Sequence, residues 1–306
     1  MADDPKPNLI IAGAPKCGTT SLHHYLDQHP EVFMCRPKEP HHFGRDLDIR
    51  HPMRVESEAD YLKLFASPES AGAKVRGDAS TWYLYSKQAA QEIQAFTPDA
   101  KIVVMLREPA SYINSLHLQA LNTDNETILS LEAALAAEPD RLEGRNLPEH
   151  AKFRCHAHYR ASARFAEQVQ RYVGAFGRDR VFVALLDDMK ADLPGLLRRL
   201  FAFLDIDPDF QPTLEAQNTT RALSSADLWV KRLFYRSRTA TKLVKKAPKP
   251  VLNAYRWVTS SVLPSARGKA ADEALMRSLR EEFAGEVRQL ADVIHRDLSA
   301  WAPRSG

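Results

Sequence analysis

The sequence predicts an α/β fold in which a mostly parallel central sheet lies between two layers of helices, followed by a helical C-terminal extension. Three observations lead to this prediction. Short apolar runs alternate with amphipathic segments as far as about residue 210, a loop with two glycines follows the first run, and the chain after residue 218 has a basic, helical pattern. We expect one domain over residues 1–306, with its core over about 8–210 and the extension over about 218–306.

Five short apolar runs predict the strands of the sheet. Short continuous runs of this kind are typical of strands that are buried on both faces. In chain order they are Leu9–Ala12, Val32–Met34, Val75–Gly77, Lys101–Leu106 and Val181–Leu186. The run KIVVML, at 101–106, is the clearest of the five.

Helices are predicted between these strands. The segment 18–28 places Leu22, Tyr25 and Leu26 on one face. Ser57 begins a capping-box pattern that opens a helix through residue 65, and Pro109 suits the first turn of a helix that reaches about residue 119. Further helices are expected at 88–96, 158–176 and 193–204, whereas 122–151 is polar and less regular.

Composition limits the class of protein. Hydrophobic residues make up 44% and charged residues 26% of the chain, which is ordinary for a soluble globular protein, and no apolar stretch approaches the roughly 18 residues of a membrane span. The first residues, MADDPKPN, do not resemble a secretory signal. Three scattered cysteines, Cys17, Cys35 and Cys155, indicate a reducing compartment and no disulfide framework. We therefore expect a cytoplasmic protein.

The stretch GAPKCGTTSL, which begins at Gly13, has the spacing of a phosphate-binding loop. In the nucleotide-hydrolase form, G-x-x-x-x-G-K-[ST], lysine follows the second glycine. Here Thr19 follows Gly18, and the lysine, Lys16, lies inside the loop. A strand, a glycine loop and a helix present backbone N–H groups and a positive helix end to an anion. The sequence thus predicts a P-loop-like three-layer fold with an anion site, made by Lys16, Cys17, Gly18, Thr19, Thr20 and Ser21.

The loop PKCGTTSL resembles the 5′-phosphosulfate loop of the sulfotransferases that use 3′-phosphoadenosine 5′-phosphosulfate (PAPS), particularly their bacterial and heparan-sulfotransferase-like branch. The stretch KIVVMLREPASYINSLHL is similar to the 3′-phosphate element of that family, in which an arginine ends a strand and a serine follows eight residues later; Arg107 and Ser115 keep this spacing. The segment 159–207 is also similar to the family pattern. The resemblance covers roughly residues 8–210 and implies a transferase with PAPS as sulfuryl donor and no required metal.

A planar guanidinium and a hydroxyl suit a ribose 3′-phosphate, so we expect Arg107 and Ser115 to bind it. Lysine inside the loop suits sulfuryl transfer, in which charge develops on the leaving oxygen as it does in phosphoryl transfer. The family also uses a late basic loop with an R/K-G motif to hold the 3′-phosphate. No such motif is clear here, and Arg221 is a substitute for it.

A base is needed to accept the proton of the attacking acceptor. The stretch RPKEPHHF, at 36–43, resembles the K-E-P-H-x-F element of heparan-type and many bacterial sulfotransferases, in which glutamate is the base. The resemblance implies this role for Glu39. His41 and His42 are alternatives, because cytosolic members of the wider family use a histidine. Asp78 is expected near the strand ends, as a substrate contact, a partner of a cation or an N-cap.

Three other functions would depend on other features of the sequence. The histidine pairs at 23–24, 41–42 and 156/158 lack H-E-x-x-H or zinc spacing, so we expect no metal site. In a P-loop kinase, Asp187 and Asp188, after the last strand, would bind magnesium. This sequence, however, lacks the G-K-[ST] motif of such kinases. Residues 221–269 hold 12 lysines or arginines against one acid, which leaves a nucleic-acid or membrane-surface protein as an alternative.

The expected partner is a small-molecule, carbohydrate or lipid acceptor, and no nucleic acid. Residues 122–151 and the basic extension are expected to choose the acceptor. The extension is expected to pack its aromatic side on the core with its cations in solvent, and it also allows peripheral contact with a membrane.

Overall fold

The computed structural model describes residues 6–149, 151–214 and 272–303. Its centre is a five-stranded parallel sheet in the order β2-β3-β1-β4-β5. The strands are β1 (Leu9–Gly13), β2 (Val32–Met34), β3 (Val75–Ala79), β4 (Lys101–Leu106) and β5 (Val181–Leu185). All five predicted strands are therefore confirmed, and so is their parallel arrangement.

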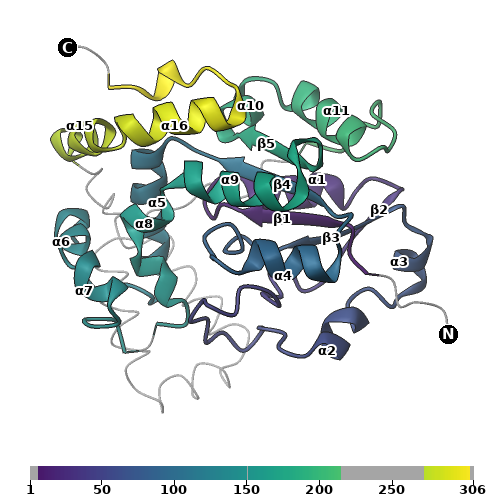
Figure 1. The fold of residues 1–306 in the computed structure, drawn as a ribbon, viewed down its shortest axis with the longest axis horizontal. Coiled ribbons are helices and arrows are strands. Elements are labelled where there is room, and N and C mark those ends of the chain that lie inside the picture. The colour runs from purple at the N-terminus through teal and green to yellow at the C-terminus, as the bar shows by residue number, and fades with distance from the viewer. Residues whose placement is uncertain (1–5, 150, 215–271, 304–306) are drawn as a thin grey trace, which may run out of the picture.

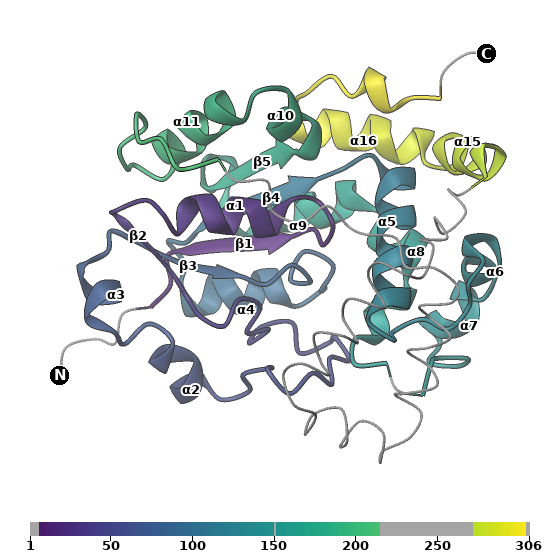
Figure 2. The ribbon, with the colours of Figure 1, turned by 180° about the vertical axis from the view of Figure 1, so that it is seen from behind.

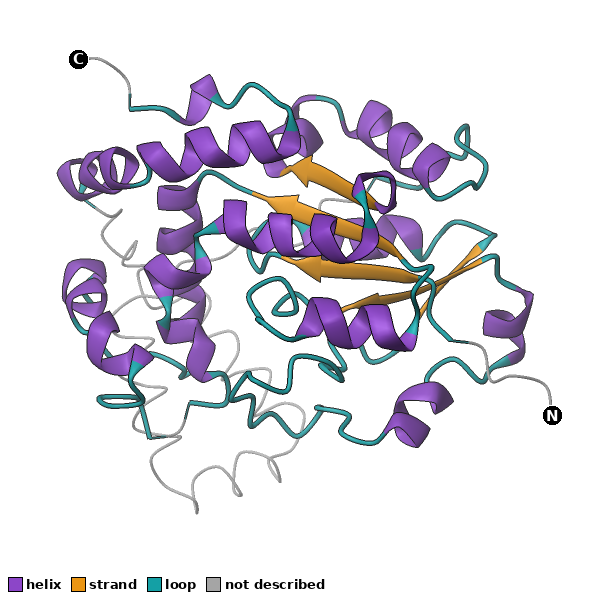
Figure 3. Ribbon diagram, viewed as in Figure 1, coloured by secondary structure: helices purple, strands orange, loops and turns teal. Residues whose placement is uncertain are grey.

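Helices cover both faces of the sheet. Helix α1 (Thr19–Leu26) lies on one face (Figure 2), and α4 (Ala89–Phe96) and α9 (Phe165–Phe176) lie side by side on the other (Figure 1). Consecutive strands are joined by crossover connections that run over a face of the sheet, because a tight hairpin would make the next strand antiparallel. Figure 3 shows the resulting three layers.

The remaining helices surround this core. Helix α16 packs along α9, and α15 packs against α5. The bounds are α2 (Glu58–Lys63), α3 (Pro68–Gly72), α5 (Pro109–Asn122), α6 (Leu131–Ala136), α7 (Glu138–Leu142), α8 (Tyr159–Ser162), α10 (Leu186–Ala191), α11 (Leu193–Phe203), α15 (Glu273–Glu282) and α16 (Ala284–Ile294), with short 3₁₀ turns η1 (Arg154–Ala157), η2 (Arg178–Arg180) and η4 (Ser299–Trp301). The two C-terminal helices agree with the predicted helical extension, whose residues 215–271 lie outside the described ones.

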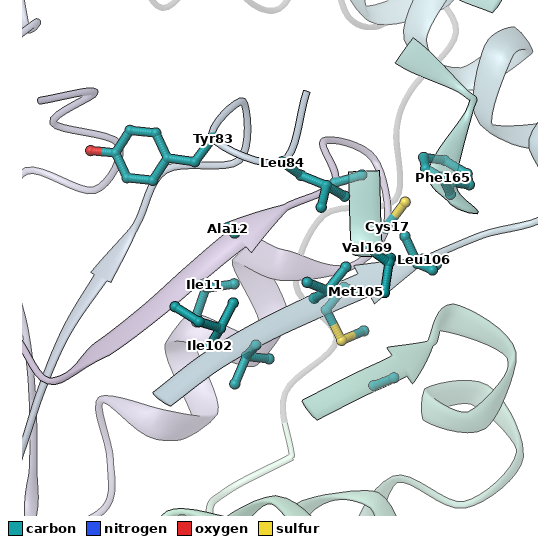
Figure 4. Close-up of a cluster of buried hydrophobic side chains, with 14 of the residues drawn as sticks. Ile11, Ala12, Cys17, Tyr83, Leu84, Ile102, Met105, Leu106, Phe165 and Val169 are labelled. Carbon is teal, nitrogen blue, oxygen red and sulfur yellow. The ribbon is translucent and has the colours of Figure 1, made fainter. Parts of the chain in front are cut away.

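The core is formed by the central strands and the helices over them. Every residue of β1 is buried, and β4 is buried from Ile102 onward. Figure 4 shows side chains of β1, β4 and α9 packed together with Leu84 and Cys17. Burial on both faces explains why these strands are continuous apolar runs without polar alternation.

The helix predicted over 158–176 is two helices, α8 and α9, and that prediction was wrong in its continuity. Two side chains satisfy the backbone at the break, one from the C-terminal helices and one from α9 itself. The Glu286 carboxylate accepts a hydrogen bond from the N–H of Ala166, and Gln168 Nε2 donates to the carbonyl of Ser162. These contacts replace helical hydrogen bonds that local sequence alone would favour.

The region 122–151 is more regular than predicted, because it contains α6 and α7. A buried ion pair holds it together: the guanidinium of Arg141 donates to both carboxylate oxygens of Glu126, at 2.5 and 2.8 Å. The hydroxyl of Tyr159 donates to the same carboxylate at 2.6 Å. The pair thus ties this segment to α8.

Candidate active site

A cavity of about 890 Å³ lies at the carboxyl edge of the sheet. Residues that follow all five strands line it: Lys16 after β1, Glu39 after β2, Thr81 after β3, Arg107 after β4 and Leu186 after β5. In parallel sheets of this kind, ligands bind outside the carboxyl ends of the strands, where the chain switches direction across the sheet. The cavity is therefore the candidate active site.

The loop between β1 and α1 has a conformation that depends on its glycines. Gly18 has φ of +91°, in the left-handed region that favours glycine. A side chain at Gly13 would place a Cβ atom 2.6 Å from Cβ of Leu84 and 2.8 Å from the carbonyl oxygen of Thr81. Gly13 is thus required because the chain after β3 passes directly over the end of β1.

Lys16, Gly18, Thr19, Thr20 and Ser21 all line the cavity. Burial, and then the nearby guanidinium of Arg107, hold the pKa of Lys16 below its ordinary value. The N-cap residue of α1 is Gly18, which has no side chain, so no side chain caps this helix. The N–H groups of its first turn are therefore open to an anion. The predicted anion site is brought together at these positions.

Cys17 differs from its neighbours in the loop. Its thiol points into the core, where Sγ donates to the carbonyl of Pro15 at 3.5 Å, and burial raises the pKa of the thiol. Only its backbone is therefore available to the anion site.

Arg107 and Ser115 both line the cavity, although eight residues separate them. Arg107 follows β4, and Ser115 lies in the second turn of α5. Glu108 does not pair with Arg107, because its carboxylate caps α5 by accepting hydrogen bonds from the N–H groups of Ala110 and Ser111. Among the described residues, no carboxylate lies within ion-pair distance of Arg107. The guanidinium is thus available to a phosphate.

Glu39 lies in a loop that crosses from β2 to the end of β3, where its N–H donates to the carbonyl of Ala79. Its carboxylate lies 2.8 Å from Nζ of Lys38, and Oγ1 of Thr81 donates to it at 3.3 Å. Burial acts to raise the pKa of Glu39, but the close contact with the His41 ring and the charge of Lys38 outweigh it, so that the pKa is lowered. The carboxylate is therefore charged.

The two histidines of this loop lie behind the cavity wall. His41 is 1% exposed, and its ring packs 5.3 Å from the ring of Phe153. His42 stacks on Tyr61 with ring centroids 4.3 Å apart, and its Nδ1 is 3.0 Å from the carbonyl oxygen of Val55. Neither is among the residues that line the cavity.

Asp78 lies near the strand ends, as expected, but among the described residues it has none of the three roles expected for it. This residue is fully buried at the end of β3, where three hydroxyl groups donate to its carboxylate, those of Tyr61, Ser80 and Tyr83. Burial raises its pKa in spite of these donors. Asp78 fixes the loops around the cavity and does not reach it.

Asp187 and Asp188, which would bind magnesium if the protein were a kinase, make contacts with the C-terminal segment instead. Asp188 accepts two hydrogen bonds from the guanidinium of Arg296, and Asp187 accepts one from Nε1 of Trp301. Within 6–149, 151–214 and 272–303, no group of three or more metal-ligating side chains is present. The predicted 3′-phosphate contact Arg221 lies outside the described residues.

Sequence reasoning missed a second group of lining residues. Trp82 follows β3, and the others come from segments distant in the chain: His51, Asn125, Phe153 and His156. The aromatic residues of this group carried no spacing that would have joined them. The only signal was the pair His156 and His158, which was considered as a metal pair alone.

A parallel α/β fold is typical of a group-transfer enzyme when its first loop has the spacing of a phosphate-binding loop and the same cavity holds a guanidinium after β4 and a charged carboxylate. Residues 7–212 match the family model described as the Sulfotransferase family, so the chain belongs to that family and is a transferase. The resemblance inferred from the motifs is confirmed.

Relatives and solved structures agree with this assignment. Carbohydrate sulfotransferase 15 of Mus musculus is 34% identical over 155 residues, which cover 37% of this chain and 27% of that protein. Heparan sulfate glucosamine 3-O-sulfotransferase 6 of Homo sapiens is 28% identical over 116 residues, covering 38% and 31%. The chain thus spans less than a third of the length of these curated relatives.

The crystal structure of a sulfotransferase from Alicyclobacillus acidocaldarius matches this fold with a TM-score of 0.70 at 28% identity. The match covers 97% of this chain and 98% of that one, which confirms the predicted fold class. In the described parts of the chain, the helices are too short or too polar to cross a bilayer.

Proposed function

We propose that this protein transfers a sulfuryl group from PAPS to a hydroxyl or amine of a small-molecule, carbohydrate or lipid acceptor. One observation carries the proposal. Lys16, Glu39, Arg107 and Ser115 line a single cavity, although they follow three different strands. This arrangement combines two anion sites with a charged carboxylate, which is the set of groups that sulfuryl transfer to an alcohol requires.

The donor set of the cavity fits PAPS. Lys16 and the hydroxyls of Thr19, Thr20 and Ser21 would hold the 5′-phosphosulfate, and Arg107 with Ser115 would hold the 3′-phosphate. When bound, PAPS supplies the sulfuryl group that is transferred. Lys16 stabilises the negative charge that develops on the leaving phosphate, and its position in a partly buried site strengthens this interaction.

Glu39 accepts the proton of the acceptor group as that group attacks sulfur. Glu39 is favoured over His41 and His42 because its carboxylate lines the cavity and those two rings do not. Lys38 and His41 orient the carboxylate and keep it charged. Displacement is in line, as in related phosphoryl transfer, so no covalent intermediate on the protein is needed.

The acceptor is proposed to be a hydroxylated compound, with a carbohydrate as the first candidate. The names of two relatives refer to carbohydrate and to heparan sulfate as their substrates. In this chain, the lining residues within 119–125 and 152–156 are proposed to choose the acceptor, since the donor is assigned to residues after β1 and β4.

Calorimetric titration tests the donor assignment. The metal-free protein is titrated with 3′-phosphoadenosine 5′-phosphate (PAP) and, separately, with ATP and magnesium. We expect micromolar binding of PAP, lost in Arg107→Ala and retained in the surface variant Arg198→Ala, whose guanidinium pairs with Asp209. Binding of magnesium-ATP without binding of PAP would overturn the proposal in favour of a kinase. Labelled PAPS then identifies the acceptor.

A further inference from the structure

Four aromatic rings form a row along one side of the cavity. The ring centroid of His156 lies 5.0 Å from that of Phe153, nearly parallel to it, and 5.0 Å from that of Trp82. The ring of His51 lies 5.3 Å from that of Phe153. All four residues line the cavity. We call Trp82, His156, Phe153 and His51 the aromatic wall.

The aromatic wall lies next to Glu39 by two routes. Thr81, whose hydroxyl donates to the Glu39 carboxylate, directly precedes Trp82. His41, whose Nε2 is 3.3 Å from Oε2 of Glu39, has its ring 5.3 Å from that of Phe153. An acceptor whose hydroxyl reaches Glu39 therefore has the aromatic wall beside the rest of its structure.

His156 is the polar member of the inner part of this wall. It is 4% exposed, and its Nδ1 is buried without a hydrogen-bond partner among the described residues. A buried polar atom that lacks a partner costs about 1–3 kcal/mol, so such an atom beside a cavity calls for an explanation. Burial lowers the pKa of His156 to about 3, against the raising effect of Glu39, so that the imidazole is neutral and has one donor and one acceptor nitrogen.

The structure also fixes the position of this wall. Oδ1 of Asn125 accepts hydrogen bonds from the N–H groups of Lys152 and Phe153, at 2.7 and 2.9 Å. Asn125 is itself buried, and its Nδ2 donates to Oγ1 of Thr123. Support of this kind is what keeps a binding site in one geometry before the ligand arrives.

We infer that His156 is an acceptor-binding residue, whose imidazole hydrogen-bonds a neutral hydroxyl adjacent to the hydroxyl that Glu39 deprotonates, while the partly exposed ring of Phe153 packs against the C–H groups of the acceptor. This inference rests on the proposed function. A carboxylate or sulfate at the same point would face an uncharged ring beside Glu39, whose negative charge acts on His156 more strongly than the positive charge of Lys16, so an anionic group is disfavoured there. The acceptor class is therefore a ring that carries neighbouring neutral hydroxyls, as a pyranose does.

The test uses 4-nitrophenyl β-D-glucopyranoside as a neutral probe and 4-nitrophenyl β-D-glucuronide as its anionic counterpart. Each is titrated into the full chain saturated with PAP. We expect the glucoside to bind more tightly than the glucuronide. His156→Phe, which keeps a ring in the row but removes the hydrogen bond, should weaken glucoside binding about tenfold or more. His156→Gln keeps a hydrogen-bonding group and should recover part of the loss.

The affinity for PAP distinguishes a failure of the inference about His156 from a failure of the proposed function. In both His156 variants, this affinity should stay within about twofold of the wild-type value. Wild type that binds PAP but not the glucoside would overturn the inference, as would equal glucoside affinity in wild type and His156→Phe. Tighter binding of the glucuronide would show that this point takes an anion. Failure of wild type to bind PAP would instead overturn the proposed function. Thermal melting establishes whether each variant is folded. If His156→Phe does not fold, the comparison is made between wild type and His156→Gln.

Discussion

The Nε2 atom of buried His41 lies 3.3 Å from Oε2 of Glu39. Since Nζ of Lys38 lies 2.8 Å from the other carboxylate oxygen, both oxygens of Glu39 have a partner behind or beside the cavity wall. Burial alone would raise the pKa of Glu39, but these two partners lower it below its ordinary value. The carboxylate is thus unprotonated at neutral pH and fixed in orientation, so it is placed to accept a proton, although its lowered pKa makes it a weaker base than an ordinary carboxylate.

We predict that Glu39→Gln lowers kcat by about 10²–10⁴-fold, because the amide cannot accept the acceptor proton. The affinity for PAP should change by less than about twofold, since Glu39 is not among the groups assigned to the donor. Turnover of labelled PAPS and calorimetry measure the two quantities. Glu56→Gln, at an exposed glutamate, is the matched control. Wild-type turnover in Glu39→Gln would transfer the role of base to another group.

Lys16→Ala is predicted to lower turnover by about 10²–10³-fold, the usual effect of removing one donor to a developing negative charge. PAP binding should weaken as well, because the same ammonium contacts the phosphate in the ground state. The fold should be retained, since the Lys16 side chain lines the cavity and does not belong to the core. Lys87→Ala, at an exposed lysine, is the control. Normal turnover in Lys16→Ala would contradict the assigned mechanism.

The strands and the donor loops could be predicted from sequence because each signal is local. A continuous apolar run marks a strand of a parallel sheet, and Lys16 with Gly18, or Arg107 with Ser115, keep a fixed spacing within one strand–helix connection. The structure places both donor elements in one cavity, as two neighbouring parallel strands must. Local pattern was therefore sufficient to predict that the two proposed donor elements lie in the same cavity.

The acceptor half could not be predicted in the same way. The aromatic wall joins Trp82 to Phe153 and His156 across about 70 residues of chain, and no periodicity relates them. The break between α8 and α9 has the same origin, since Glu286, from the C-terminal helices, caps α9. Asp78 was misjudged because the three hydroxyls that surround it come from two separate segments. In each case, a tertiary contact decided the outcome.

Gly13→Ala is predicted to destabilise the protein by about 1–3 kcal/mol, the usual cost of an added methyl group in packed surroundings. The new Cβ would lie 2.6 Å from Cβ of Leu84 and 2.8 Å from the Thr81 carbonyl oxygen, and a backbone cannot yield as a flexible side chain does. Gly174→Ala, in α9 with open space around it, should instead stabilise by about 0.5–1 kcal/mol. Chemical denaturation measures both, and similar effects of the two substitutions would refute the packing argument.

The contact between Asp188 and Arg296 makes a further prediction, about stability and pH. Asp188 accepts hydrogen bonds at 2.6 and 2.8 Å from this arginine and another from the N–H of Leu185, so it joins the end of β5 to the segment after α16. The hydrogen bond from Arg296 holds the pKa of Asp188 below its ordinary value, although burial opposes it. Asp188→Asn should therefore lower the free energy of unfolding at pH 7 by about 1–2 kcal/mol, the range for charged pairs that are partly open to solvent.

The pH dependence of this loss follows from the direction of the pKa shift. A carboxylate with a lowered folded-state pKa stabilises the protein above its unfolded pKa, about 3.9, and the contribution disappears as pH falls through the folded value. The difference between wild type and Asp188→Asn should thus be full at pH 6–7 and decrease below about pH 4. Asp179→Asn, at an exposed aspartate of η2, should show no comparable loss. A difference that stayed constant down to pH 3 would mean that Asp188 acts through the shape of its side chain, because an effect of its charge must vanish when the carboxylate is protonated.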